Sequence, residues 1–461
     1  MSKLKPYNNY QPIQYDYVSQ LPQGWQLLPN IAIFQERIER GFDNEELLSV
    51  TIGKGVIRQS DVDIKKDSSN EDKSKYKLIK VGDIAYNRMR MWQGALGYSN
   101  YQGITSPAYV VLKPKIEINQ RFFHYMFRAG FYTNYSKRFS YGIVDDQLSL
   151  RYVDFKRMYS VFPPLETQNV IVEYLDRKTK QIQEFIARKE RLIELLEEEK
   201  QRLVDEHIKG VHSEIEFINS GNEFIGEIPK GWLFKKLKYI AKVKGRIGFR
   251  GYTVQDIVAQ GEGAITLSPS NIFAQKFNLN EKTYLSWKKY YESPEIMVFS
   301  GDLIFVKTGS TIGKIALIPE TNEKITLNPQ LVVFKEIKIN SEFLYFLFTT
   351  SYIQKIIELD IIGGAAGTLS QQKTKSIPVF FPEPEKQRTI CENIKTDFEK
   401  IEVAKLKAQL EIEKAKEYQE SLITQIVTGQ LKVPENINAN LRQNGELGMV
   451  AEPDTLYKST N

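Results

Sequence analysis

Two stretches of the sequence concentrate side chains that are suited to contact nucleic acid. Residues 87–93 read Asn-Arg-Met-Arg-Met-Trp-Gln, and residues 307–314 read Lys-Thr-Gly-Ser-Thr-Ile-Gly-Lys. Arg and Gln can form paired hydrogen bonds to base edges, while Arg, Lys and hydroxyl side chains can hold phosphates. We therefore predict DNA contacts from Asn87, Arg88, Arg90, Trp92, Gln93, Lys307, Thr308, Ser310, Thr311 and Lys314.

A second pair of stretches, 138–151 and 363–375, has similar chemistry. The alternative for both pairs is that their charges are solvated loop residues and that Trp92 belongs to the core. Taken as groups, the four loops favour DNA contact, although the base specificity cannot be derived. The predicted contacts in this pair are Arg138, Gln147, Ser149, Arg151, Gln371, Gln372 and Lys373.

Three catalytic motifs are only partly present, or absent, in the sequence. Residues 309–314 resemble a phosphate-binding loop, but three residues separate the glycines where four are needed, and Ile315 replaces the Mg²⁺-binding hydroxyl residue. The segments 162–165 and 328–331 each lack part of the Asn/Asp-Pro-Pro-aromatic motif of adenine methyltransferases. No dinucleotide-binding glycine pattern follows a strand. We therefore predict no catalytic residue.

Metal-binding residue types are scarce. The chain has one cysteine, Cys391, and three histidines, so we expect neither an internal disulfide nor a metal site. His124 lies on an aromatic helix face, where a hydrogen-bonded core histidine is expected rather than a catalytic base.

Composition sets broader limits. The 461 residues are 41% hydrophobic and 26% charged, as in ordinary globular proteins, and the net charge of +6 suggests a polyanionic partner. We find no apolar signal-peptide segment at the N-terminus and no run of eighteen apolar residues. We therefore expect a cytoplasmic protein that does not associate with a membrane.

Two long stretches of helix-forming residues, 168–210 and 387–429, must position the candidate loops. Apolar residues recur every seven positions in both, as in coiled coils. We expect the two helices to pack antiparallel, because two equal helices in one chain most simply return past each other. The alternative of two unrelated amphipathic helices is disfavoured because the repeat extends beyond the helices. The expected seam comprises Leu175, Ile182, Leu196, Leu203, Ile394, Ile401, Ala408, Ala415 and Leu422.

The repeat extends beyond the helices at an offset of about 219 residues. Val-Gly-Asp-Ile-Ala-Tyr-Asn-Arg at 81–88 returns as Ser-Gly-Asp-Leu-Ile-Phe-Val-Lys at 300–307, and Phe162–Gln168 returns as Phe381–Gln387. We therefore predict an α+β protein in which two similar mixed α/β domains are separated by the long helices, with a pseudo-twofold internal repeat. The predicted segments are a first domain at 1–160, a central helix at 161–215, a second domain at 216–378, a C-terminal helix at 379–432 and a polar tail at 433–461.

Shorter elements follow from local patterns. We predict a charged excursion at 61–75, with strands and helices elsewhere in each domain. The expected strands are 77–86, 108–112, 302–306, 314–318 and 330–334, and the expected helices are 120–131 and 341–355.

This arrangement resembles the specificity subunit of type I restriction-modification systems, over residues 21–433. No single motif is specific, but the duplicated order is. Residues 382–385 depart from the Pro-Pro-Leu-Glu pattern, and 208–210 depart from Val-Thr-Gly, neither of which should alter the architecture. The resemblance rests on Gly24-Trp25, Gly82-Asp83, Asn87-Arg88, Pro163–Glu166, Gln168, Gly231-Trp232, Gly301-Asp302, Pro382, Glu385, Gln387 and Val427–Lys432.

The resemblance implies a division of labour. Each domain would be a target-recognition domain for one half of a split double-stranded DNA sequence, and the helices would set the spacer. Two methyltransferase subunits carrying S-adenosylmethionine would dock against the helices, and restriction subunits using ATP and Mg²⁺ would join them. The chain itself would bind no cofactor and perform no chemistry. Because the two domains differ, the target should be asymmetric. The alternative function is a coiled-coil protein-interaction scaffold without DNA specificity.

Overall fold

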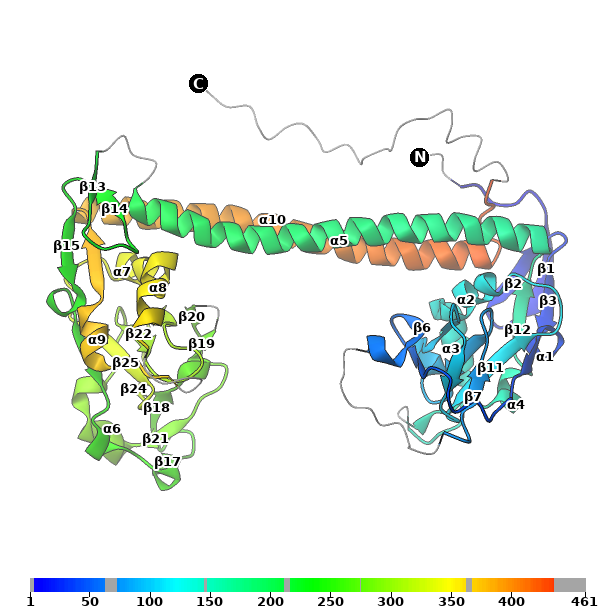
Figure 1. Cartoon of the computed structure of the whole chain (residues 1–461), viewed down its shortest axis with the longest axis horizontal. Helices are drawn as coiled ribbons and strands as arrows, with labels where there is room; N and C mark the ends of the chain where they lie inside the picture. Colours follow the sequence, from blue (N-terminus) through cyan, green and yellow to red (C-terminus); the bar gives the residue numbers. More distant parts are fainter. Residues whose placement is uncertain are drawn as a thin grey trace. The chain divides into compact units, whose positions relative to one another are not determined.

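The structure is a computed structural model that describes residues 4–62, 73–144, 147–210, 216–273, 275–361 and 367–434 (Figure 1). The chain forms two compact units: the first unit is Met1–Lys189 with Leu410–Asn461, and the second unit is Glu190–Gln409. Both units therefore contain a globular body and part of each long helix, and the predicted domain boundaries stay a prediction. Most of the expected excursion at 61–75, and the polar tail beyond residue 434, lie outside the described residues.

The body of the first unit is built on a four-stranded antiparallel sheet in the order β4-β11-β8-β9. Side chains alternate across it, as strand geometry requires. Ile84 and Tyr86 pack with the helix residues Phe123 and Phe127, whereas Ala85 packs on the other face with Leu48 and its neighbours. These strands are β4 (Phe34–Glu36), β8 (Ile84–Asn87), β9 (Leu96–Tyr98) and β11 (Tyr109–Pro114), and the helices over them are α2 (Gln120–Arg128) and α3 (Gly130–Arg138).

Smaller elements complete this body. Two-stranded antiparallel sheets join β1 to β2, β3 to β12, β5 to β6 and β7 to β10. Their bounds, with those of the short helices, are β1 Tyr10–Tyr15, β2 Val18–Pro22, β3 Gln26–Pro29, α1 Asn30–Ile33, β5 Leu48–Thr51, β6 Gly55–Arg58, η1 Gln59–Asp61, β7 Lys77–Ile79, η2 Met91–Gln93, β10 Gly103–Thr105, α4 Tyr152–Phe155 and β12 Tyr159–Phe162.

The second unit repeats this design with the sheet β16-β25-β22-β23. Leu303 and Phe305 face the helix residues Phe343 and Leu347, while Ile304 faces the opposite core. That core is shared with a second sheet, β17-β21-β18-β24. The central strands are β16 (Lys242–Gly245), β22 (Leu303–Val306), β23 (Ile315–Leu317) and β25 (Leu331–Lys335), and the helices are α7 (Ser341–Thr349) and α8 (Ser351–Leu359).

Among the remaining elements of the second unit, β18 pairs with β24 in parallel. The strand pairs β13–β14, β15–β26, β17–β21, β18–β21 and β19–β20 are antiparallel. Their bounds are β13 Phe217–Asn219, β14 Glu227–Pro229, β15 Leu233–Lys236, η4 Leu237–Tyr239, η5 Gly248–Arg250, η6 Val254–Asp256, β17 Ile257–Val258, β18 Gly263–Leu267, η7 Pro269–Asn271, β19 Ile272–Phe273, β20 Lys276–Phe277, β21 Tyr284–Ser286, α6 Trp287–Glu292, η8 Pro294–Ile296, β24 Ile325–Leu327, α9 Gln371–Ser376 and β26 Pro378–Phe381.

Three predicted elements were wrong in detail. The expected strand 77–86 is two strands, β7 and β8, in different sheets, because the chain turns at Gly82, whose φ of 94° favours glycine. The expected helices 120–131 and 341–355 each divide in two. Ala129 and Thr350 adopt extended backbone conformations there, and this ends the first helix of each pair.

The long helices are α5 (Leu165–Lys209) and α10 (Pro384–Val427). They run side by side in each unit (Figure 1). In the first unit Lys189 Nζ lies 2.8 Å from Glu411. In the second unit Lys200 pairs with Glu402, and His207 Nε2 lies 2.9 Å from Asp397.

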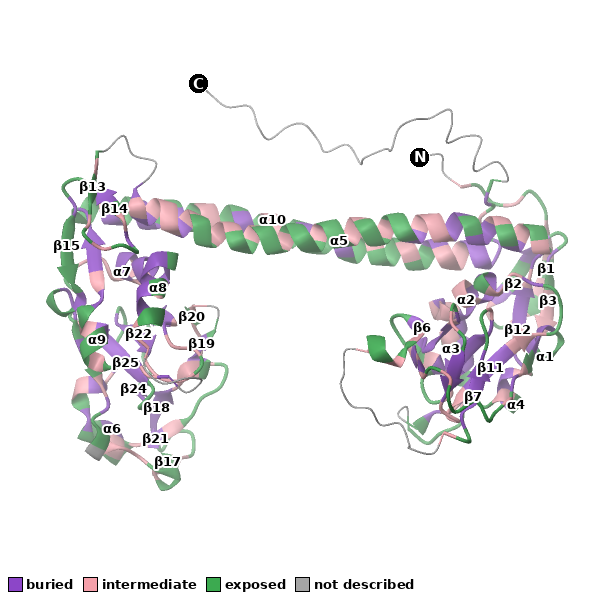
Figure 2. Cartoon of the chain, in the orientation of Figure 1, coloured by how far each residue is buried: buried purple, intermediate pink, exposed green. Residues whose placement is uncertain are grey.

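Residue numbers along these pairs rise in α5 as they fall in α10, so the helices are antiparallel in both units. None of the nine expected seam residues is exposed, whereas other positions of both helices are (Figure 2). The predicted α+β fold class is confirmed.

A buried glutamine joins each body to its long helix. In the first unit Gln168 Oε1 accepts from the Asn119 N–H at 2.9 Å, and its Nε2 donates to the Pro163 carbonyl at 2.8 Å. In the second unit Gln387 makes the same two bonds, with the Asn340 N–H at 2.9 Å and the Pro382 carbonyl at 2.7 Å. The glutamine thereby fixes the start of α5 or α10 against the start of the helix that covers the sheet.

Candidate nucleic-acid interface

The first candidate loop begins where β8 ends at Asn87. Asn87 Oδ1 accepts from the Met89 N–H at 2.9 Å, and a short helical turn, η2, follows. Gly94, with φ of 84°, ends that turn in the left-handed conformation. Met91 is buried and anchors the loop, while Arg90 and Gln93 are exposed.

Trp92 lies at the edge of this loop, and the expected alternative of a core position does not describe it. The ring is half-buried, its Nε1 donates to the Met89 carbonyl at 3.2 Å, and Lys137 Nζ lies 4.8 Å from the ring centroid. The Trp92 ring is thus held at the edge of the loop by its own hydrogen bond and by the cation over its face.

In the first unit the two candidate stretches meet through the backbone. The Leu150 N–H donates to the Arg88 carbonyl at 2.9 Å. Tyr141 and Ser149 exchange two backbone hydrogen bonds, of 3.1 and 2.8 Å. Residues 145–146 of the predicted stretch 138–151 lie outside the described residues. Arg151 stacks over the Tyr141 ring at 4.9 Å, on the same loop.

The second unit brings its two stretches together in the same way. The Leu369 N–H donates to the Lys307 carbonyl at 2.8 Å, which repeats the Leu150–Arg88 bond 219 residues later. The Gly309 N–H donates to the Gly367 carbonyl at 3.1 Å, and Thr308 pairs with Thr368. Residues 362–366, which include the beginning of the predicted stretch 363–375, lie outside the described residues.

Ion pairing divides the candidate cations into two groups. Arg138 pairs with Asp16 at 3.2 Å, Arg151 with Asp154 at 2.9 Å and Lys373 with Asp360 at 2.6 Å. The hydrogen bond that Arg151 donates to the Asp154 carboxylate raises the pKa of Arg151. By contrast, in the described part of the chain no carboxylate pairs with the cations of the loops that follow β8 and β22. Those cations are Arg88, Arg90, Lys307 and Lys314.

The uncharged candidate residues also differ in whether their side chains already have a partner. Gln371 Nε2 donates to the Val243 carbonyl at 2.8 Å, which ties α9 to β16, so this amide already has a structural partner. Gln93, Gln147, Gln372 and Ser310 are exposed, and Ser149, Thr308 and Thr311 are half-buried. The exposed amides and hydroxyls are therefore better placed than Gln371 to meet a ligand.

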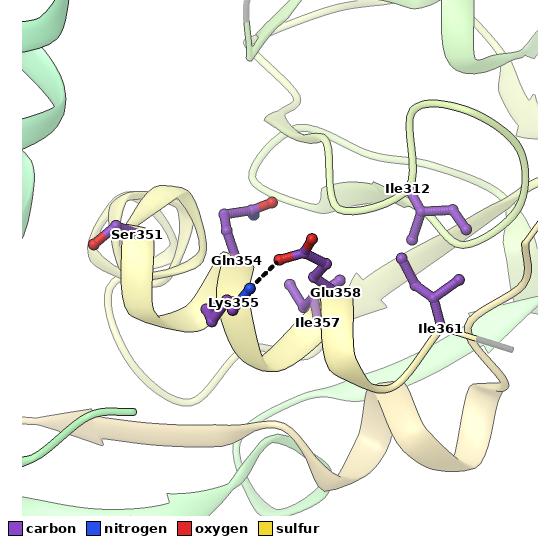
Figure 3. A pocket seen from close by; sticks show the side chains of 7 residues that line it. All are labelled: Ile312, Ser351, Gln354, Lys355, Ile357, Glu358 and Ile361. Atoms are coloured by element: carbon purple, nitrogen blue, oxygen red, sulfur yellow. Dashed lines mark hydrogen bonds and ion pairs between the residues drawn. The ribbon is translucent and has the colours of Figure 1, made fainter. Parts of the chain in front are cut away.

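A pocket of about 350 Å³ adjoins the loop that follows β22. Ile312 of that loop lies across from Ile357 and Ile361 (Figure 3). Lys355 and Glu358 form a 2.8 Å ion pair at its rim. Three isoleucines and four polar or charged side chains line the pocket, and most of them belong to α8.

His124 is hydrogen-bonded, as the sequence predicts, but its side chain is half-buried at the edge of the core. Its Nδ1 accepts from the Tyr98 N–H at 3.1 Å. Burial, with the nearby Arg128 and Arg121, lowers the pKa of His124 to about 3, so the imidazole is neutral at physiological pH. Among the described residues there is no cluster of three or more His, Cys, Asp or Glu side chains that could hold a metal ion.

Two features near the loops could not be predicted from the sequence. Buried Asp83 forms hydrogen bonds of 2.6 and 3.0 Å with Arg37, and Asp302 pairs with Lys335 at 2.6 Å, so each Gly-Asp turn is fixed by a cation distant in sequence. Ile143 is a large aliphatic residue exposed at the tip of the loop beside Arg88. The only sequence signal for it is an apolar pair inside an otherwise polar stretch.

The chain is similar in sequence to known proteins of DNA specificity. Residues 229–414 match the family model described as type I restriction modification DNA specificity domain. The specificity subunit of the type I restriction enzyme MjaVIII from Methanocaldococcus jannaschii is 25% identical over 383 residues, which cover 79% of this chain and 84% of that protein.

Two solved structures share the fold. One, from work on complex assembly and conformational transition of the type I R-M system, has a TM-score of 0.65 at 14% identity and covers 90% of this chain and 100% of its own. The HsdS subunit from Thermoanaerobacter tengcongensis has a TM-score of 0.55 at 15% identity, with 89% and 98% covered. The chain is thus similar to a type I specificity subunit over most of its length and to the DNA specificity domain in its second half, and it shares the fold of the HsdS subunit.

Proposed function

We propose that this chain reads a bipartite, asymmetric DNA sequence and directs methylation and restriction by partner subunits. The observation that carries the proposal is the repeated backbone bond, from Leu150 to Arg88 and from Leu369 to Lys307, which builds a cationic double loop in each unit. As a specificity subunit the chain is a non-catalytic recognition protein.

Within each double loop the side chains would divide the work. Arg88, Arg90, Lys307 and Lys314 have no acidic partner among the described residues, so we expect their charge to meet phosphates or base edges. Arg88 Nε donates to the Ala108 carbonyl at 3.2 Å, which leaves its other guanidinium nitrogens for such a contact. The exposed amides of Gln93, Gln147 and Gln372 suit paired hydrogen bonds to adenine. Because the residues at matching positions differ, the two half-sites should differ in sequence.

The long helices would hold the spacer between half-sites and receive the partner subunits. In the second unit Val403 and Leu406 of α10 lie on one helix face and are 67% and 64% exposed. Exposed aliphatic side chains of this kind are typical of interaction surfaces. We expect two methyltransferase subunits there, with restriction subunits joining them in the cytoplasm. S-adenosylmethionine, ATP and Mg²⁺ would bind those subunits.

A gel-shift experiment with the cognate methyltransferase subunit tests the proposal, at a fixed salt concentration of about 150 mM because phosphate contacts are salt-dependent. The complex should prefer one sequence from a random library, and a double variant Arg90→Ala, Lys307→Ala should bind it more weakly. Equal binding to all sequences would instead favour a protein-interaction scaffold.

A further inference from the structure

A third loop adjoins the double loop of each unit. It directly precedes β11 in the first unit and β25 in the second unit. The Arg88 N–H donates to the Ala108 carbonyl at 3.3 Å, and the Lys307 N–H donates to the Gln330 carbonyl at 2.9 Å. Because the two bonds lie at matching places in the repeat, Gln330 of the second unit corresponds to Ala108 of the first.

The same kind of turn shapes both third loops. In the first unit Ser106 Oγ accepts from the Ala108 N–H at 3.3 Å, and in the second unit Asn328 Oδ1 accepts from the Gln330 N–H at 2.9 Å. Such side-chain acceptors two residues back are typical of tight turns. The two units therefore share the backbone of this loop and differ in what it carries, a methyl group in one and an amide in the other.

Asn328 also orients the Gln330 amide. Asn328 Nδ2 donates to Gln330 Oε1 at 3.1 Å, and Asn328 is only 9% exposed. Gln330 is exposed, and a Cβ atom added at Gly309 would lie 3.6 Å from its Nε2. The amide thus lies beside the backbone of the candidate loop that follows β22. A side chain held in this way loses less rotamer freedom on binding than a mobile one.

The hydrogen-bonding groups that the Gln330 amide has left match one base edge. Its Oε1 has a second lone pair, and its Nε2 donates to no group in the described part of the chain. A glutamine amide donates to N7 of adenine and accepts from the N6 amino group in the major groove. Guanine has acceptors at both places, so Gln330 Oε1 would face another acceptor there.

We propose that Gln330, positioned by Asn328, reads an adenine in the half-site of the second unit. This rests on the proposed function and deepens it, because it assigns a residue that determines specificity and the base that it recognises. The first unit has Ala108 at the matching position and would make no such contact. The third loop would therefore add to the asymmetry of the target.

The test uses the complex of the full chain with its methyltransferase subunit and DNA carrying the target found by methylome sequencing. Each adenine of the target is replaced in turn by 7-deazaadenine, in which a C–H group replaces the N7 acceptor. Wild-type affinity should fall roughly fivefold at one position, the loss expected for one hydrogen bond. Gln330→Ala should bind the natural target roughly tenfold more weakly and show no further loss with 7-deazaadenine at that position.

Asn328→Ser tests the positioning role. This variant has the residue of the first unit, so it keeps an acceptor for the Gln330 N–H but removes the donor to Gln330 Oε1. The loss caused by 7-deazaadenine should become smaller at the same position, while the melting temperature stays near that of the wild type. An undiminished loss would remove Asn328 from the contact.

Gln260→Ala is the matched control, because Gln260 is exposed in the same unit but precedes β18 at the end away from Asn328. It should behave as wild type. Silent 7-deazaadenine at every position, unchanged affinity of Gln330→Ala, or a 7-deazaadenine loss that persists in Gln330→Ala would each overturn the adenine contact. Wild-type binding without sequence preference would instead refute the proposed function itself, and it is measured first.

Discussion

At the scale of single residues, ion pairing separates the cations that we propose to contact DNA from cations that already have an acidic partner. Arg90 is exposed and has no carboxylate partner in the described structure, whereas Lys355 is paired with Glu358. Arg90→Ala should weaken DNA binding and reduce the slope of log affinity against log salt by about one. Lys355→Ala is the control and should leave the slope unchanged. An unaltered slope for Arg90→Ala would remove Arg90 from the interface.

His124 gives a prediction about pH. Burial lowers its native pKa to about 3, while the unfolded chain has a value of about 6.5. Between these values the unfolded state binds a proton that the native state does not, so stability falls as the pH drops below about 6.5. His124→Asn keeps an acceptor for the Tyr98 N–H but cannot titrate. Thermal unfolding at pH 7.5 and 5.0 should show a smaller acid-induced loss for the variant, and equal losses would contradict the assignment.

At the scale of elements, one glutamine positions each long helix. Gln168→Ala leaves a part-buried N–H at Asn119 and the buried Pro163 carbonyl without their partner, which should cost about 2–4 kcal/mol. Asn169→Ala is the control, since Asn169 makes only an exposed side-chain bond to Asn119. Thermal melting of the full chain should show a much larger decrease for Gln168→Ala. Similar melting temperatures would show that the clamp contributes little.

The pairing of the long helices determines where a lengthening insertion must go. The sequence repeat alone matches Lys200 with Gln419, but the structure pairs Lys200 with Glu402. Inserting seven residues after each of Lys200 and Glu402 preserves the heptad register and adds about 10 Å of helix. The methylated target should then have a spacer longer by about three base pairs. An unchanged spacer would show that the helices do not set it.

At the scale of the whole molecule, duplication explains what sequence analysis could foresee. Long periodic helices and a repeat offset are global signals, so the fold class followed from them, whereas the meeting of the candidate loops is visible only in the structure. The ends of α2 and α7 could not be predicted in this way. Ala129 and Thr350 end these helices by adopting extended backbone conformations, which their residue types do not indicate. Partners distant in sequence, such as Arg37 for Asp83 and Val243 for Gln371, are visible only in the structure.

The central claim is that the two units read unlike half-sites independently. Methylome sequencing of cells that carry the chain with its methyltransferase subunit tests this most directly. Wild type should give a motif of two different half-sites around a fixed spacer, and replacing 307–314 by the residues of 88–95 should change one half-site only. A contiguous motif, or a change in both half-sites, would contradict the account.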